Sequence, residues 1–401
     1  TINKCLMSGS PDYSLVRSLA FWRLKNYAAS TDIGKFFNQI CLYPQDRQHL
    51  NMIFTENFGI DDPPEWFCLL VHSFGYPSTS AIAKEAVLKI SETATIEELH
   101  EVAKTLKLGY VDDLNPSVDT EEQLSKLKED TTKIMSRHGM ELKGWAVTGE
   151  LPEASLSPKP FTMVGGWKWY SKEDKIQLRI PDIYLGKKKK GKEIEESKIL
   201  HQDPTEDELN AFYRSETVNL DHIISRVASL FDVTGQTTPL AVLGHYVARM
   251  ALQDTATDTT APVSQPTRKL FLKFLYLTSK FGKLLFLRNP GRADPDKDSV
   301  LVAFADSSNT AWVVVLYLVR TTKNNEFFTQ FVHSAGGLNP PDRTIPRSEL
   351  NSYTRAAQMI DLLGDIMEGV ATQKKLIGDS KSAMFWVLNG AKKTSIFVQN
   401  R

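Results

Sequence analysis

Two neighbouring carboxylates, Asp112 and Asp113, stand directly after the apolar and aromatic run Leu108-Gly-Tyr-Val111. Two adjacent aspartates are costly to bury without partners. A β-hairpin would solve this problem, because its bend would lift both side chains out of the sheet to an edge where they can meet a metal ion. The simpler interpretation is a polar turn that happens to be acidic, and short motifs of this kind specify little by themselves.

A third carboxylate, Asp32, stands where another strand pattern ends, so a shared sheet could bring it to Asp112 and Asp113. Carboxylate oxygens are the ligands that hard divalent cations prefer. Two such cations catalyse phosphoryl transfer when they bind a few Å apart. Three clustered carboxylates repel one another without cations. We therefore predict that these aspartates bind two Mg²⁺ ions, with Mn²⁺ as a possible substitute.

A second set of acids, Asp306, Glu349 and Asp379, occupies equivalent places in a different part of the sequence. Asp306 ends a strand, Glu349 lies in the first turn of a helix expected over 346–367, and Asp379 ends a short strand. Each acid alone would pass for a surface group. Together, in this order, they predict a second two-metal site, in which water is activated.

The elements expected around these acids alternate between helices and strands, which indicates an α+β fold. In the first half, Ile96, Leu99, Val102 and Leu106 recur at helical spacing and predict a helix over 95–107. The second half is helical in pattern from 204 to 252, and a linker is expected over 254–267, before a basic and apolar stretch from Arg268 to Arg288. Further helices are expected over 13–25, 79–90 and 120–138, and strands over 66–74, 140–145 and 163–169.

Composition excludes several classes of protein. The 401 residues are 41% apolar and 24% charged, with 48 basic and 48 acidic residues, as in an ordinary globular protein. No apolar run is long enough to span a bilayer, and the start has no signal-peptide plan. Three cysteines are too few for a disulfide framework. We expect a cytoplasmic protein without a membrane partner, and a piece of a longer chain because Thr1 is not a methionine.

Several segments resemble motifs of reverse transcriptases. The first is Thr31-Asp-Ile-Gly-Lys-Phe-Phe-Asn-Gln-Ile40, and the others are Phe74–Ser80, Tyr110-Val-Asp-Asp113 and His138–Trp145. Further segments make the chain most similar to BEL/Pao-type long-terminal-repeat retrotransposon polyproteins: Ile2–Gly9, Ser225–Gly235 with Pro239, Thr344–Leu350 and Phe397–Arg401. The strands and helices after residue 299 also follow the order of a ribonuclease-H-like domain.

The resemblance implies a right-hand polymerase followed by a ribonuclease-H-like α/β domain. Residues 1–200 would form partial fingers and palm, 201–298 a helical thumb or connection, and 299–401 the ribonuclease H. The polymerase would extend a DNA primer on an RNA template with deoxynucleoside triphosphates, and the nuclease would degrade RNA in RNA–DNA hybrids. We expect this protein to reside within cytoplasmic retroelement particles. Template choice and oligomeric state stay open.

The resemblance also assigns roles to residues. The catalytic metal ligands would be Asp32, Asp112, Asp113, Asp306, Glu349 and Asp379, with the carbonyl of Ile33 helping Asp32 and Asp112. The nucleotide would contact Ile33, Phe37, Gly75, Tyr76 and Tyr110. Phe37 would exclude a 2′-hydroxyl, unless it is an ordinary core residue. Residues 163–169 would form the primer grip or a buried strand pair. Lys143 could be a general acid, although a surface role is simpler. Lys187–Lys190 is either a solvated loop or a nucleic-acid contact.

The sequence departs from the family pattern in three places. In the family, the residues that grip the triphosphate lie on a basic hairpin before the first motif. Only 31 residues precede Asp32, so we expect much of that hairpin to be absent from this stretch. The fourth nuclease acid would follow Arg401, and three acids predict weak metal binding. Pro77-Ser-Thr-Ser80 replaces the usual Ser-Pro pair. A non-catalytic nucleic-acid-binding relic is therefore the main rival hypothesis. An RNA-dependent RNA polymerase is disfavoured by the bulk of Phe37 and by the ribonuclease H.

Overall fold

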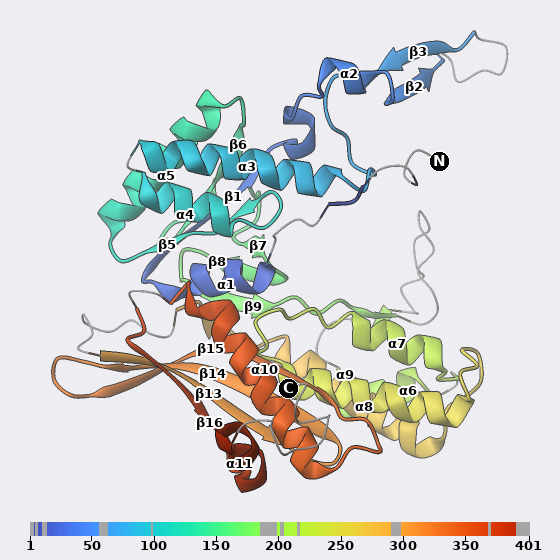
Figure 1. The fold of residues 1–401 in the computed structure, drawn as a ribbon. Helices are drawn as coiled ribbons and strands as arrows, with labels where there is room; N and C mark the ends of the chain where they lie inside the picture. The colour runs from blue at the N-terminus through green and yellow to red at the C-terminus, as the bar shows by residue number, and fades with distance from the viewer. Residues whose placement is uncertain are drawn as a thin grey trace. The chain divides into compact units, whose positions relative to one another are not determined.

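The computed structural model describes residues 4, 7–9, 14–55, 63–97, 99–184, 199–200, 204–214, 217–289, 298–367 and 370–389. The chain forms two compact units (Figure 1). Unit 1 comprises Thr1–Thr162 and Ser171–Glu173, and unit 2 comprises Met163–Tyr170 and Asp174–Arg401. Both units mix helices with strands, as the sequence predicts. The expected three-part division at residues 200 and 298 stays a prediction.

Strand β1 (Tyr27–Ile33) is the centre of the sheet in unit 1. It pairs antiparallel with β4 (Asp113–Leu114), β5 (Ser117–Val118) and β6 (Leu142–Val147). The register sets Asp32 opposite Asp113. Residues far apart in the sequence are therefore brought together by backbone pairing alone.

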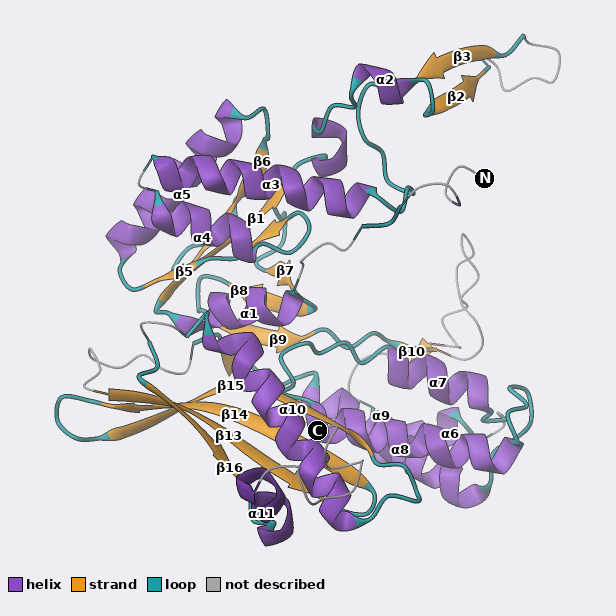
Figure 2. Cartoon of the chain, in the orientation of Figure 1, coloured by secondary structure: helices purple, strands orange, loops and turns teal. Residues whose placement is uncertain are grey.

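Three helices pack together over these strands: α3 (Thr79–Ile96), α4 (His100–Leu108) and α5 (Glu121–Arg137) (Figure 2). A capping box at Thr120 satisfies backbone donors at the start of α5. The helices and strands share one hydrophobic core, which includes Ile33, Val87, Ile90, Leu106, Leu114, Leu127 and Ile134.

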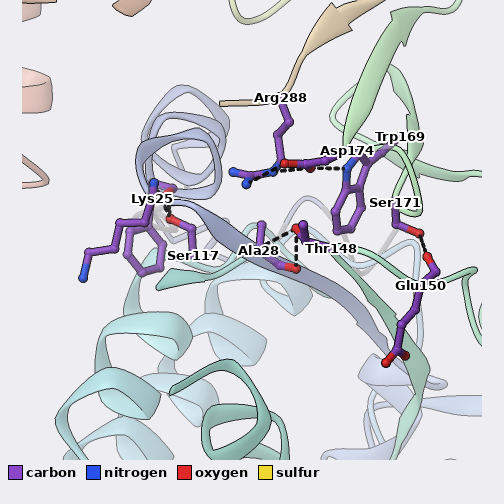
Figure 3. A network of polar contacts seen from close by, with 10 residues as sticks. Lys25, Ala28, Ser117, Thr148, Glu150, Trp169, Ser171, Asp174 and Arg288 are labelled. Carbon is purple, nitrogen blue, oxygen red and sulfur yellow. Dashed lines mark hydrogen bonds and ion pairs between the residues drawn. The ribbon is translucent and has the colours of Figure 1, made fainter. Parts of the chain in front are cut away.

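Two hydrogen bonds tie helix α1 (Leu15–Leu24) of unit 1 to the sheet. The backbone N–H of Lys25 donates to Ser117 Oγ at 3.2 Å, and that hydroxyl donates to the carbonyl of Phe21 (Figure 3). The remaining elements of this unit are the 3₁₀ helix η2 (Phe36–Gln39), α2 (Pro44–Arg47), and the hairpin of β2 (Asn51–Phe54) and β3 (Glu65–Cys68).

Several expected boundaries in unit 1 are wrong, and α3 runs six residues past the end expected at residue 90. The helix expected over 95–107 is divided, because α3 continues to Ile96 and α4 begins only at His100. Ile96 is 83% exposed and does not share the buried face of Val102 and Leu106. The strand expected over 66–74 is shorter, since β3 ends at Cys68.

A small antiparallel sheet opens unit 2, in the order β12-β9-β8-β7. Its strands are β7 (Thr162–Val164), β8 (Trp167–Tyr170), β9 (Lys175–Leu178) and β12 (Phe286–Leu287). β7 spans the boundary between the units.

Arg288 is fully buried beside this sheet, and its Nε lies 2.8 Å from Oδ1 of Asp174. Trp169 Nε1 donates to the same oxygen at 3.1 Å (Figure 3). A buried charge requires such pairing, so this contact fixes β12 beside β9.

Four helices follow: α6 (Glu206–Phe212), α7 (Leu220–Ala228), α8 (Thr238–Thr255) and α9 (Gln265–Phe281). Their core includes Leu209, Ile223, Val247, Phe271 and Phe274.

The linker expected over 254–267 is wrong. Its last three residues belong to α9, and Asp254 Oδ2 accepts two hydrogen bonds from Ser264, which closes a compact loop between α8 and α9. The short pair β10 (Ile183–Tyr184) and β11 (Ile199–Leu200) also lies here.

The second sheet of unit 2 has the order β15-β14-β13-β16. Its antiparallel strands are β13 (Asp298–Ser307), β14 (Ala311–Thr321) and β15 (Phe327–Leu338), and β16 (Gln373–Ile377) runs parallel to β13. Helix α10 (Ile345–Gly364) packs on β13 and β14, and α11 (Lys381–Asn389) contacts α10. The element order expected from the sequence is present. Glu349, however, is the fifth residue of α10 rather than part of its first turn.

The loop before α8 is joined closely to this second sheet. Asp232 accepts hydrogen bonds from Thr234, Gly235 and Thr237, which fixes the loop. Gly235, with a φ of 80°, lies so near the backbone of Ser334 on β15 that no side chain would fit. Helix α8 also packs on β15. The helices and the second sheet are therefore parts of the same unit.

None of the helices in the described ranges combines the length and the apolar character needed to cross a bilayer. Two expected features lie outside the described residues: the Lys187–Lys190 loop and the segment Phe397–Arg401.

Candidate metal centres in the two units

The structure brings Asp32, Asp112 and Asp113 together in unit 1. Asp32 lies near the end of β1, Asp112 lies in the turn before β4, and Asp113 is the first residue of β4. One carboxylate oxygen from each residue lies within 4.8 Å of the others. Such spacing would allow one cation to contact all three residues, and carboxylate oxygens suit Mg²⁺ or Mn²⁺.

A tight turn presents Asp112. The backbone groups of Tyr110 and Asp113 exchange two hydrogen bonds of 2.9 Å, so the turn contains only Val111 and Asp112. Val111 has a φ of 54°, which is a costly conformation for a β-branched residue. The backbone N–H of Ile33 donates to the carbonyl of Asp112 at 2.9 Å. The strained turn is therefore held against β1.

Lys84 supports the start of the same hairpin, and the sequence analysis missed it. Its side chain is 3% exposed, and its Nζ donates to the carbonyls of Lys107 at 2.8 Å and Gly109 at 3.3 Å. A cation here also complements the negative end of α4. The sequence feature that could have indicated this role is the position of Lys84, next to Ala83 on the buried side of α3.

Electrostatic repulsion within the first cluster is marked. Burial, followed by the charges of Asp112 and Asp32, raises the pKa of Asp113 to about 7. Burial also raises the pKa of Asp112. Lys143 on β6 offsets part of this charge, since its Nζ lies 2.7 Å from Oδ1 of Asp32 and this hydrogen bond raises the pKa of Lys143. Lys143 is thus exposed but also in contact with the acidic cluster.

The residues expected to contact a nucleotide occupy different environments. The Ile33 side chain is in the core, at 1% exposure, and leaves only its backbone for a ligand. Phe37 is half-buried and stacks on Phe36 with ring centres 5.5 Å apart. Tyr110 flanks the turn of Asp112, whereas Gly75 and Tyr76 lie in the loop before α3. Their contacts with a nucleotide stay predictions.

The second cluster lies at one end of the second sheet of unit 2. Parallel pairing of β13 and β16 sets Phe304 beside Ile377, so Asp306 and Asp379, each two residues later, leave the sheet together. Glu349 approaches from α10. One oxygen from each acid lies within 4.8 Å of the others.

Glu349 has the environment of an unsatisfied ligand. It is 5% exposed, and among the described residues its Oε2 has no hydrogen-bond partner. Burial, followed by the charges of Asp306 and Asp379, raises its pKa to about 7. A buried carboxylate oxygen without a partner is unfavourable, and a divalent cation would satisfy it. The donor set of this cluster therefore fits a divalent cation.

A sheet of this order, with α10 across it and three acids at one end, is that of a ribonuclease-H-like domain. Residues 221–380 match the family model of the Pao retrotransposon-like RNaseH-like domain. This match confirms the resemblance to Pao-type retrotransposons. It also starts within α7, so the family domain includes helices α7–α9.

Solved structures agree with the fold. The foamy viral protease–reverse transcriptase in complex with an RNA/DNA hybrid is 12% identical, with a TM-score of 0.54 over 98% of this chain and 44% of that chain. The foamy viral protease–reverse transcriptase dRH in complex with ds DNA is 11% identical, with a TM-score of 0.55 over 94% and 54%. This chain spans about half the length of those proteins. No curated protein matches the sequence.

Proposed function

We propose that the chain is the reverse transcriptase and ribonuclease H part of a Pao-type retroelement. Unit 1 would polymerise DNA on an RNA template, and unit 2 would cleave the RNA strand of RNA–DNA hybrids. The observation that carries this proposal is the gathering of three carboxylates within 4.8 Å in each unit. The rival hypothesis, a nucleic-acid-binding relic without catalysis, requires no such pair of clusters.

In the polymerase centre, Asp32 and Asp112 would hold two Mg²⁺ ions, with the carbonyl of Ile33 assisting and Asp113 supporting. Such ions promote attack by the primer 3′-hydroxyl and stabilise the leaving pyrophosphate. Asp113 must lose its proton to support the ions, and its pKa of about 7 makes this possible near neutral pH. Lys143 pairs with Asp32. When the metal ions occupy the carboxylates, the same lysine would be close enough to contact the triphosphate instead of Asp32.

The nucleotide pocket would be formed by residues around this centre. Phe37 stands on η2, directly after β1 and its Asp32, and its partly exposed ring would lie under the incoming sugar and exclude a 2′-hydroxyl. Gly75 and Tyr76 would line the template side of the pocket, and Tyr110 would contact the primer end.

In the nuclease centre, Asp306, Glu349 and Asp379 would hold two divalent cations that activate water against the RNA strand. The buried Oε2 of Glu349 supports this role, because it lacks a partner within the described structure. Glu349 also lies on α10, whose packing on β13 and β14 fixes its position relative to Asp306.

Nucleic acid is the partner that the charge distribution supports. No acidic residue occurs from 259 to 293, although the chain is neutral overall. Helix α9 lies in this stretch and exposes Lys269 and Lys273 one turn apart, beside a groove shared with α6. Lysines at this spacing could neutralise neighbouring phosphates of one strand. The two foamy viral proteins are recorded with an RNA/DNA hybrid and with ds DNA.

The test is a pair of assays on one preparation with Mg²⁺. We expect extension of a DNA primer on an RNA template and, because only three nuclease acids are present, slow cleavage of RNA in a hybrid. Asp112→Asn should abolish extension alone, and Asp379→Asn should abolish cleavage alone. If neither reaction occurs with Mg²⁺ or Mn²⁺ while hybrid binding persists, the non-catalytic rival is correct.

A further inference from the structure

Tyr353 lies one helical turn after Glu349 on α10 and faces the segment that carries Asp379. Its side chain is 4% exposed, although it has a polar end. Its hydroxyl oxygen accepts a 3.0 Å hydrogen bond from the backbone N–H of Ser380. Its ring lies directly against Gly378. Tyr353 therefore contacts the residue on each side of Asp379.

The contact at Gly378 depends on the absence of a side chain. A Cβ at this position would overlap the ring and hydroxyl of Tyr353. The backbone of Gly378 is not in the left-handed region, so its conformation alone does not require glycine. A glycine is required at position 378 because the side chain of Tyr353 fills the space that a Cβ would occupy.

The contact at Ser380 reaches the start of α11. Ser380 Oγ accepts from the N–H of Ala383 at 3.3 Å, and its carbonyl accepts from the N–H of Met384 at 2.9 Å. The Ser380 N–H, which precedes the helix, is satisfied by Tyr353. The tyrosine thus fixes the backbone where β16 ends and α11 begins.

We propose that Tyr353 is a positioning residue for Asp379, holding the backbone at Gly378 and Ser380 so that the carboxylate meets Asp306 and Glu349. This role rests on the proposed nuclease centre. Helix α10 then does two things at that centre: it supplies Glu349 directly and it sets the place of Asp379 through Tyr353. Groups that orient metal ligands are commonly worth about 10- to 100-fold in metal affinity.

The first experiment measures Mn²⁺ binding by electron paramagnetic resonance in the full chain. Asp112→Asn and Asp113→Asn are present throughout, so that the unit 1 cluster does not contribute. Adding Tyr353→Phe, which keeps the ring and removes the hydroxyl, should weaken Mn²⁺ binding about 10-fold. The matched control is Tyr170→Phe, which removes a tyrosine hydroxyl that contacts Gln177 in the other sheet of unit 2. The control should leave Mn²⁺ affinity unchanged.

The second measurement is amide hydrogen exchange at Ser380 and does not depend on metal. Tyr353→Phe should accelerate exchange at this amide, while amides in β13 keep their protection. Unchanged exchange at Ser380, or unchanged Mn²⁺ affinity, overturns the positioning role. If Mn²⁺ binding in the parent is not reduced by Asp379→Asn, the nuclease centre itself is refuted. The Ser380 exchange then still decides whether Tyr353 holds this backbone.

A double-mutant cycle tests the contact with Gly378. Gly378→Ala should weaken Mn²⁺ binding strongly when Tyr353 is present, because the new methyl group displaces the ring. It should have a smaller effect in the Tyr353→Ala background, where the space is empty. Contacting residues show such non-additive effects. Equal effects in both backgrounds would overturn the proposed fit.

Discussion

The Nζ of Lys143 lies 2.7 Å from Oδ1 of Asp32, at the centre of the acidic cluster in unit 1. This ion pair joins β6 to the end of β1 and places a positive charge where three carboxylates repel one another. It also means that a divalent cation and Lys143 compete for the same oxygen. The side chain of Lys143 is 48% exposed, so water weakens the ion pair. Replacing the ammonium group by a divalent cation at Asp32 therefore costs little free energy.

Replacement of this lysine should separate metal binding from catalysis. In Lys143→Gln, Mn²⁺ should bind the unit 1 cluster a few-fold more tightly, because the competing cation is gone. Primer extension should slow, since the proposed contact with the triphosphate is lost. Electron paramagnetic resonance in an Asp379→Asn background measures the first effect. The control is Lys133→Gln, which replaces an exposed lysine of α5. Weaker Mn²⁺ binding in Lys143→Gln would contradict the proposed competition between the lysine and the metal ion.

The raised pKa values of Asp113 and Glu349, each about 7, predict how stability depends on pH without metal. Each carboxyl binds its proton more tightly in the folded than in the unfolded chain. Its contribution to stability is therefore complete below about pH 4 and is lost as the pH rises through 7. With a chelator present, these two groups should lower the melting temperature between pH 5.5 and 7.5, and Asp113→Asn should reduce that fall.

Divalent cations should reverse this trend. Ligation requires the deprotonated carboxylates, so the stabilisation of the fold by Mg²⁺ should grow as the pH rises from 5.5 to 7.5. Thermal melts with and without Mg²⁺ at both pH values measure it. An equal stabilisation at both pH values would show that Asp113 and Glu349 are not ligands.

Phe36 and Phe37 offer a matched pair for testing sugar selection. Phe37→Ala should raise ribonucleotide incorporation relative to deoxynucleotide in a primer-extension assay, with little loss of stability because the ring is half-buried. Phe36 is 4% exposed, so Phe36→Ala should instead destabilise unit 1 by about 3–5 kcal/mol. Unchanged discrimination in a folded Phe37→Ala variant would assign this ring to the core.

Much of the two acidic clusters could be predicted from sequence because each acid follows directly from a strong local pattern. Asp32 and Asp306 lie near the ends of apolar strands. Pairing of these strands with β4 and β16 then brings the other aspartates of each cluster close to them. The supporting residues could not be found in this way. Lys84 and Tyr353 act on backbone groups at Gly109 and Ser380, and such contacts depend on how helices pack, which no periodicity reveals.

Helix boundaries failed for a related reason. Ile96 fits the apolar spacing of Val102 and Leu106, yet α3 ends at Ile96. Just past this end, the N–H of Leu99 bonds to the carbonyl of Ala94 five residues earlier, which departs from the α-helical pattern before that face can continue. Likewise, the Thr- and Asp-rich stretch from Asp254 reads as a linker by composition. Its aspartate instead accepts hydrogen bonds from Ser264 and shapes a tight connection between two packed helices.

The acid-free stretch on α9 leads to a prediction about nucleic-acid binding. The double variant Lys269→Gln and Lys273→Gln should weaken binding of an RNA–DNA hybrid uniformly across sequences. It should also lower the slope of log affinity against log salt concentration by about 2, because each lysine releases about one counterion. Fluorescence anisotropy at several salt concentrations measures both. The control is Lys126→Gln with Lys133→Gln on α5, an equal loss of charge from exposed positions of a helix in unit 1. If the two double variants reduce the slope equally, general charge rather than the α9 surface determines binding.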